Sequence, residues 1–212
     1  MKLVLISDTH GKHRELQLPQ GDILIHAGDF SMIGEEETVK DFNLWLGEQS
    51  FKHKLVQAGN HDLGFERDSK KFESMLTNCR YLRDETINIE GLKMFFSPYT
   101  PFFSSDYWVF QKHGMIALKE HWKQIPENLD LLVTHGPPSY ILDRTLEGKH
   151  AGDVLLLERL YELKYPPVIH CFGHIHEGYG SFKSPFKKIG FLNISVLDRE
   201  YRLTNPPTVV EL

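Results

Sequence analysis

The chain has 212 residues, of which 41% are hydrophobic and 25% charged, so its composition is that of a globular protein and excludes disordered and fibrous classes. Its net charge of −5 gives no basic field for a polyanion, which disfavours duplex nucleic acid as a partner. No apolar run approaches the roughly 20 residues of a membrane-spanning helix, and no signal-peptide pattern precedes the first strand-like run. We therefore expect a cytoplasmic protein without a membrane partner, a monomer or homodimer that acts on a small substrate.

Six short apolar runs rich in valine, isoleucine and leucine recur along the chain. Each has four to six residues, which suits a strand buried on both faces better than a helix. The expected strands are residues 3–6, 23–27, 54–58, 129–134, 168–172 and 191–196. Helical periodicity marks the segments 36–49, 68–78, 113–125 and 153–163 between them, with Ser69 and Asp153 as candidate helix starts. The alternation of strands and helices predicts an α/β protein.

Two segments break this alternation. Residues 86–89 and 92–96 flank Glu90-Gly91, which predicts a β-hairpin with a two-residue turn and hence a second or a mixed sheet. Residues 97–109, rich in proline, serine and aromatics, predict a long ordered loop whose aromatic rings either join the core or offer a stacking surface for a nucleobase. No repeat or linker interrupts the chain, so we expect a single domain over residues 1–212.

The cysteines and three of the histidines predict supporting roles. Cys79 and Cys171 lack a CxxC spacing and indicate free thiols, buried in a helix and a strand, in a reducing compartment. His26 and His170 lie within apolar runs and predict hydrogen-bonded core residues that support the polar motifs nearby. His150 lies in the segment 139–152, from which it could reach a substrate.

Polar clusters directly follow five of the apolar runs. They are SDTH at 7–10, GD at 28–29, GNHD at 59–62, HGP at 135–137 and GHIH at 173–176. Because ligands bind outside the carboxyl ends of the strands in open α/β sheets, the five clusters should converge on one edge. Glycines at 28, 59 and 173 precede the polar residues, at strand exits where close backbone approach is useful.

The aspartate, histidine and asparagine side chains of these clusters form an oxygen and imidazole ligand set without cysteine. Such a set suits Mn²⁺, Fe, Zn²⁺ or Mg²⁺ rather than a thiolate site. Seven side chains are too many for one tetrahedral ion but suit two ions about 3.5–4 Å apart, which activate water and neutralise phosphoryl oxygens in phosphatases and nucleases. The pattern therefore predicts a dinuclear site for phosphoryl chemistry.

The order DxH, GD, GNHD, H and GHxH resembles that of the calcineurin-like metallophosphoesterases over about residues 3–196. Four longer motifs narrow the resemblance to the branch of metallophosphoesterase-domain-containing (MPPED) proteins, which is close to the class III cyclic nucleotide phosphodiesterases. These motifs are SDTHG, HAGDF, THGPP and FGHIHEGYG. The resemblance implies a four-layer α/β/β/α sandwich, in which two mixed β-sheets are flanked by helices and the hairpin joins the second sheet. We further expect the segments 97–109 and 139–152 to form the walls of the substrate pocket.

The same resemblance implies a role for each motif residue. The first metal would be held by Asp8, His10 and His176, the second by Asn60, His135 and His174, with Asp29 as the bridge. His61 would face the scissile phosphate as a catalytic residue, and Asp62 would orient it. The implied cofactors are two divalent ions, Mn²⁺ first, with Fe, Zn²⁺, Co²⁺, Ni²⁺ and Mg²⁺ as alternatives. Because the GHIH run keeps both histidines, an active enzyme is expected.

We therefore expect a phosphodiesterase that hydrolyses a small phosphodiester, such as a cyclic or linear nucleotide, by attack of a metal-bridging hydroxide. A phosphomonoesterase or pyrophosphohydrolase is the first alternative, disfavoured because only Arg14 and Arg144 lie near the motif loops to clamp an additional charge. A nucleotide-binding scaffold with little turnover is the second. A DNA exonuclease would need a basic groove, and an amidohydrolase carries its HxH pair on the first strand, so neither fits.

Overall fold

A computed structural model describes residues 1–212, with thirteen strands and five α-helices. The strands are β1 (Lys2–Ile6), β2 (Ile23–His26), β3 (His53–Val56), β4 (Arg80–Tyr81), β5 (Glu85–Ile89), β6 (Leu92–Ser97), β7 (Thr100–Pro101), β8 (Gln111–Lys112), β9 (Leu131–Thr134), β10 (Ile169–Phe172), β11 (Gly180–Lys183), β12 (Gly190–Asn193) and β13 (Thr208–Glu211). The helices are α1 (Glu36–Glu48), α2 (Gly64–Arg67), α3 (Ser69–Met75), α4 (Met115–Trp122) and α5 (Val154–Glu162), with the 3₁₀ turns η1 (His13–Glu15) and η2 (His176–Gly178). None of the helices combines the length and apolar character needed to cross a bilayer.

Two large mixed sheets form the centre of the molecule. The first has the order β13-β1-β2-β3-β4, in which β1 to β4 are parallel and β13 runs antiparallel to β1. The second has the order β11-β12-β10-β9-β6-β5, in which the four inner strands are parallel and the two outer strands antiparallel to their neighbours. Parallel strands must be covered on both faces, and this requirement sets the layers of the fold.

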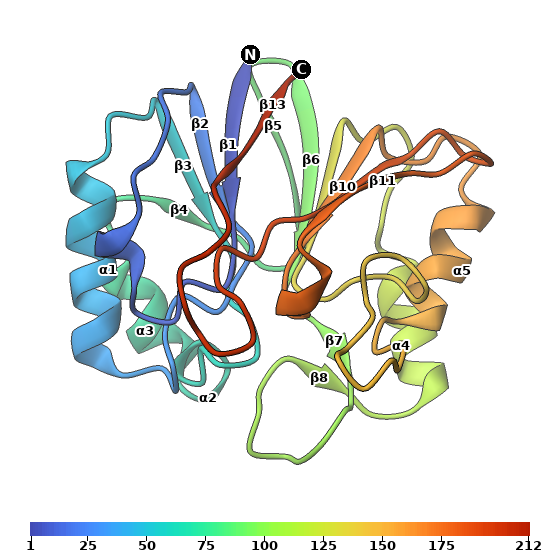
Figure 1. Ribbon diagram of the computed structural model, residues 1–212, viewed down its shortest axis with the longest axis horizontal. Helices are drawn as coiled ribbons and strands as arrows, with labels where there is room; N and C mark the ends of the chain where they lie inside the picture. The colour runs from blue at the N-terminus through green and yellow to red at the C-terminus, as the bar shows by residue number, and fades with distance from the viewer.

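The alternation of side chains along each inner strand feeds two separate cores. In β1, Leu3 and Leu5 pack between the two sheets, whereas Val4 and Ile6 face the helical layer. Figure 1 shows α1, α2 and α3 on the outer side of the first sheet and α4 and α5 on the outer side of the second. The predicted α/β/β/α sandwich is confirmed, and so is the placement of the predicted hairpin, since β5 and β6 join the second sheet.

The hairpin turn has the geometry that its sequence predicts. Glu90 and Gly91 have φ values of +54° and +89°, the left-handed pair that a two-residue type I′ turn requires. Ile89 and Leu92 face each other across the turn and set the register of the pair. Side chains of β5 and β6 therefore alternate with the phase needed to bury Ile87 and Met94 between the sheets.

Several predicted boundaries are wrong. The helix expected over 68–78 ends at Met75, so Cys79 lies in the turn before β4 rather than in a helix, while Cys171 is buried in β10 as expected. Asn43 of α1 explains the early end, because its side chain accepts the backbone N–H of Asn78 at 2.8 Å and donates to the Thr77 hydroxyl. The segment 97–109 is not entirely a loop, since β7 within it pairs with β8.

The carboxyl ends of the inner strands of both sheets meet at one edge, the lower one in Figure 1. Backbone hydrogen bonds of 3.0 Å join Ser7 to Ile194 and Val196 to Ser7, so β1 of the first sheet is linked there to the segment after β12 of the second. The polar clusters that follow these strands are therefore brought to a common seam between the sheets.

Candidate metal centre

The first group of potential ligands at this seam consists of Asp8, His10 and His176. Asp8 and His10 follow β1, and His176 begins η2 after β10; their ligand atoms lie within 4.8 Å of one another. His176 Nε2 is 3.7 Å from Asp8 Oδ1. These three side chains, two from the first sheet and one from the second, could share one divalent ion.

The second group consists of Asp29, His135 and His174, whose ligand atoms also lie within 4.8 Å of one another. His135 Nε2 is 3.2 Å from Asp29 Oδ2 and 3.0 Å from Asn60 Oδ1, which adds the asparagine to this group. Asp29 Oδ2 is in turn 3.8 Å from His10 Nε2 of the first group. Asp29 thus lies between the groups, where a bridging carboxylate would be needed, and the structure brings all seven predicted ligands together.

Backbone carbonyls fix the orientation of three histidine rings. The Nδ1 atoms of His135, His176 and His61 lie 3.0, 2.9 and 2.6 Å from carbonyl oxygens. Because a carbonyl only accepts, Nδ1 must carry the proton in each ring, which leaves Nε2 to act as a ligand or to meet substrate. The acceptors are the carbonyls of Ala27, Asp198 and Met32 respectively.

Four of the predicted ligands have an unusual backbone conformation. Asp8, His10, Asp29 and His174 have φ values of +57°, +41°, +56° and +66°, in the left-handed region that residues other than glycine seldom adopt. Each such residue costs on the order of 1 kcal/mol or more, and such conformations concentrate at functional sites. The surrounding hydrogen bonds hold them in place, as where Asp8 N–H donates to the Gly28 carbonyl at 2.9 Å.

Close approach explains two of the motif glycines. A Cβ atom on Gly173 would overlap the carboxylate of Asp8 and the side chain of Ser7. A Cβ on Gly28 would lie 2.7 Å from His135 Nδ1, and the φ of +108° there is itself unfavourable for other residues. Both glycines therefore leave room for candidate ligands, as the sequence predicts.

Burial and mutual charge set the protonation of the centre. Burial opposes ionisation of Asp8 and Asp29, yet His176 beside Asp8 and His135 beside Asp29 outweigh it and hold both carboxyl pKa values below the ordinary value. Conversely, burial is overcome at His135 and His176 by Asp29 and Asp8, which raise each imidazole pKa to about 9. At His174 burial dominates and lowers the pKa to about 3.

The buried ring of His10 has the properties expected of a metal ligand. Its side chain is buried, and neither Nδ1 nor Nε2 has a hydrogen-bond partner within the protein. Burial lowers its pKa to about 4, so the ring is neutral near pH 7 and presents an unused lone pair toward Asp29 and Asp8. An unpartnered buried imidazole beside two carboxylates fits a divalent cation, and the donor set fits two.

The structure shows no side-chain contact between the two residues of the predicted catalytic pair. His61 donates Nδ1–H to Met32 and lies with its ring centroid 4.6 Å from that of His10, next to the candidate ligands. The carboxylate of Asp62 is fully buried and accepts from the backbone N–H groups of Asp29, Gly59 and Ser31 and from the Ser31 hydroxyl. None of these bonds reaches the His61 ring, so Met32 orients His61, whereas Asp62 braces the backbone of the metal motifs.

The supporting histidines have the predicted surroundings. His26 Nδ1 accepts from the Gly28 N–H at 3.2 Å, so its Nε2 carries the proton and donates to the Thr9 hydroxyl at 3.0 Å. His170 Nε2 contacts the Thr134 hydroxyl at 2.7 Å, one residue before His135. Both rings are fully buried and connect to residues that flank candidate ligands.

His150, by contrast, is exposed, and its Nδ1 lies 2.7 Å from Oδ1 of Asp143 rather than near the candidate ligands.

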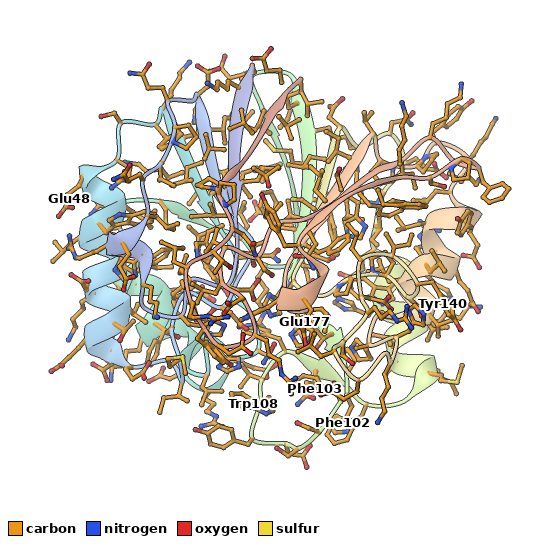
Figure 2. The ribbon with its side chains drawn as sticks, viewed as in Figure 1. Glu48, Phe102, Phe103, Trp108, Tyr140 and Glu177 are labelled. Carbon is orange, nitrogen blue, oxygen red and sulfur yellow. The ribbon has the colours of Figure 1, made fainter.

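A cavity of about 220 Å³ opens beside the candidate ligands. Its lining comprises the side chains His10, Asp29, Asn60, His61, Phe103, Trp108, His174, His176, Glu177, Arg199 and Tyr201. Figure 2 shows Phe103 and Trp108, from the segment between β7 and β8, beneath the two sheets, with Glu177 of η2 above them. The predicted wall 97–109 is confirmed through Phe103 and Trp108.

The other predicted wall borders this cavity without lining it, since its Glu147 pairs with Arg199 and its Leu146 N–H contacts Glu177. No residue of the segment 139–152, His150 included, lines the cavity, and its place is taken by Arg199 and Tyr201 from the segment after β12. The sequence carried no signal for these two residues, because no motif surrounds them and only the packing of that segment against η2 brings them to the site. The hydrogen bond from His176 Nδ1 to the Asp198 carbonyl fixes that packing.

The two-sheet sandwich, with aspartate and histidine side chains converging at the carboxyl ends of both sheets, defines the metallophosphoesterase fold. A family model described as calcineurin-like phosphoesterase matches residues 1–178. The chain belongs to this family, whose members typically bind two divalent metals and are metal-dependent phosphoester hydrolases.

Two relatives agree with this assignment, and one solved structure shares the fold. Metallophosphoesterase domain-containing protein 1 of Homo sapiens is 36% identical over 234 residues, covering 100% of this chain and 71% of that protein. A UPF0046 protein of Caenorhabditis elegans is 33% identical over 225 residues, covering 99% of this chain and 74% of that protein. The structure of TT1561 of Thermus thermophilus superposes on this chain with a TM-score of 0.61 at 12% identity, covering 99% of this chain and 98% of that one. This likeness concerns the fold only.

Proposed function

We propose that the protein is a phosphodiesterase that hydrolyses a small phosphodiester, with a nucleotide as the favoured substrate. The proposal rests on the lining of the cavity beside the candidate ligands, which combines aromatic side chains with a single arginine. Family membership implies phosphoester hydrolysis; the lining supports the kind of ester.

Aromatic rings flank the candidate ligands at two places. The indole of Trp108 lies with its ring centroid 4.2 Å from that of His61, and the ring of Phe103 lies 5.2 Å from that of His174. Phe103 is 45% exposed, so its ring remains available to a bound molecule. Stacking of a nucleobase on such a ring contributes about 1–3 kcal/mol and demands no particular base. Tyr99 and Phe110 of the same region are instead buried in the core.

The charge of the lining favours a diester over a monoester. A diester carries one negative charge, whereas a monoester carries nearly two near neutral pH and gains from a cationic clamp. Arg14 pairs with Asp41 and Glu48, and Arg144 is directed to the Gly148 carbonyl, so neither lines the cavity. Arg199 is the one arginine that lines the cavity, so a monoester phosphate at the candidate ligands would find a single guanidinium rather than a clamp of several.

The residues suggest how such a reaction would be assisted. Two divalent ions held by the seven predicted ligands would supply an activated water and neutralise charge on the phosphoryl oxygens; we propose Mn²⁺ for both. His61, with its Nδ1–H held by Met32, would turn Nε2 toward the scissile phosphate. There it would stabilise developing charge or protonate the leaving oxygen.

The test is hydrolysis by metal-free protein reconstituted with Mn²⁺, with bis(p-nitrophenyl) phosphate and p-nitrophenyl phosphate compared at equal concentration. We expect the diester to turn over faster. A preference for the monoester would overturn the proposal in favour of a phosphatase. Binding of Mn²⁺ with no turnover of either ester would identify a nucleotide-binding scaffold instead.

A further inference from the structure

The segment 198–202 forms one side of the cavity and lies beyond the residues matched by the family model. It contributes Arg199 and Tyr201 to the lining, and its Asp198 carbonyl holds the ring of His176 at 2.9 Å. The ring of Tyr201 lies 4.9 Å from that of His10, in an edge-on arrangement. This short segment therefore touches the candidate metal centre and the substrate space at once.

Hydrogen bonds fix the segment in place. The Lys12 ammonium donates to the Tyr201 carbonyl at 2.7 Å, and the Arg202 side chain donates to the Asp198 carboxylate at 2.7 Å. Tyr201 itself has a φ of +58°, a left-handed conformation that these contacts must maintain. The backbone on both sides of Arg199 is therefore held in place, which fixes the point on the cavity wall from which its side chain extends.

The partner of Arg199 is weakly bound and replaceable. Arg199 Nη2 lies 3.0 Å from Glu147 Oε1, and the two side chains are 51% and 55% exposed. An exposed single-contact ion pair of this kind contributes about 0–1 kcal/mol. A phosphate group offers three oxygens and up to two charges, and can accept two parallel N–H bonds from a guanidinium. A phosphate reaching Arg199 should therefore displace Glu147.

We propose that Arg199 binds a second phosphate of the substrate, attached away from the scissile diester, and so makes the enzyme prefer phosphodiesters that carry a further phosphomonoester. This inference rests on the proposed phosphodiesterase function. Arg199 is the one lysine or arginine lining the cavity, while Glu177 on the same lining bears the opposite charge and has only a 3.4 Å contact with the Leu146 N–H. The Arg199 guanidinium is thus the one lysine or arginine cation of the lining that an additional phosphate could contact.

The test compares two matched chromogenic diesters, thymidine 5′-(p-nitrophenyl phosphate) and the same ester bearing a 3′-phosphate, with Mn²⁺-loaded protein. The quantity measured is the ratio of kcat/KM for the bisphosphate ester to that for the monophosphate ester. We expect a ratio well above one, and a fall of about tenfold in Arg199→Gln, which corresponds to about 1.4 kcal/mol of binding. Glu147→Gln removes the competing carboxylate and should raise the ratio.

Arg80→Gln is the matched control, because Arg80 is likewise exposed, pairs with one carboxylate, that of Glu85, and lies outside the cavity. It removes the same charge from the protein and should leave the ratio as in the parent. An unchanged ratio in Arg199→Gln, or an equal fall in Arg80→Gln, would overturn the inference. Failure of both esters to react would contradict the proposed function itself.

A binding measurement keeps the inference testable without turnover. Calorimetric titration with thymidine 3′,5′-bisphosphate and thymidine 5′-phosphate reports the same difference as dissociation constants. We expect the bisphosphate to bind more tightly to the parent protein and this advantage to be lost in Arg199→Gln. Equal affinities in the parent would refute a second phosphate site, whatever the activity.

Discussion

The carboxylate of Asp62 accepts the backbone N–H of Asp29 at 2.9 Å, so one buried acid holds the chain that presents the central carboxylate of the candidate metal centre. The same carboxylate accepts the N–H of Gly59, just before Asn60. Burial and the charge of Asp29 raise the pKa of Asp62 to about 7 in spite of these bonds. The GD motif at 28–29 and the GNHD motif at 59–62 are therefore held together by a buried side chain that does not line the cavity.

Asp62→Asn should reduce stability and metal content together. An amide would turn a donor toward backbone N–H groups that need an acceptor, at a cost of about 1–3 kcal/mol for each buried group left unpaired. Urea unfolding and elemental analysis of the purified variant measure both effects. A variant with full metal content and stability but slow turnover would instead show that Asp62 acts on His61, the role implied by the sequence resemblance.

Asp29→Ala should abolish hydrolysis and lower the metal content below two ions per chain. Asp29 Oδ2 faces both His135 and His10, at 3.2 and 3.8 Å, so its loss removes a ligand from both groups. Elemental analysis and the diester assay test this directly, with Glu120→Ala as a surface control, since Glu120 is exposed and pairs with Lys123 outside the cavity. Full activity in Asp29→Ala would refute a shared, bridging position.

His61→Ala should retain both ions and slow turnover. His61 Nδ1 is committed to Met32, and its ring adjoins His10 from the cavity side. Loss of a general acid typically costs 10²- to 10⁴-fold, and the defect should shrink for good leaving groups such as p-nitrophenolate. Comparing a series of leaving groups at constant metal content tests this expectation. If metal is lost as well, His61 belongs to the ligand set.

Stability should fall on acidification because two histidines away from the cavity are buried in the neutral form. Burial lowers the pKa of His170 to about 3 and that of His121 to about 4. In the unfolded chain the pKa of each histidine is near 6.5. Below pH 6.5 the unfolded chain therefore binds protons that the folded protein does not bind. The free energy of unfolding decreases as the pH falls, until the pH reaches the folded-state pKa values.

At pH 5 each of these two histidines should contribute a loss of about 2 kcal/mol relative to pH 7, on the order of 1.4 kcal/mol per pH unit. Urea unfolding of metal-free protein at the two pH values measures the change. His121→Gln keeps a polar group near the Ser97 hydroxyl, which contacts His121 Nε2 at 3.0 Å, and should weaken the pH dependence. An equal pH dependence in the parent and this variant would contradict the assignment for His121.

The sequence predicted the layers and the metal motifs because both depend on local patterns. Buried parallel strands appear as short apolar runs, and each ligand of the set directly follows such a run or sits in the turn after it. The capping role of Asp153 was also readable, since its carboxylate accepts the N–H groups of Leu155 and Leu156 at the start of α5.

The features that the sequence did not predict depend on contacts between distant segments. The length of α3 is set by Asn43, some 35 positions away from Asn78 along the chain. The presence of Arg199 in the cavity depends on Lys12 and His176 holding the segment 198–202, and no local pattern encodes those contacts. The strand β13 pairs with β1 only because the chain returns to the edge of the first sheet.

Each candidate ion takes side chains from both halves of the sandwich. The first would join Asp8 and His10 of the first sheet to His176 of the second, and the second ion would likewise join Asn60 to His135 and His174. Metal loading should therefore act as a cross-link between the layers. Chelation should loosen the seam at Ser7 and Val196 before either sheet unfolds, and amide hydrogen exchange there should accelerate ahead of exchange in the strand interiors.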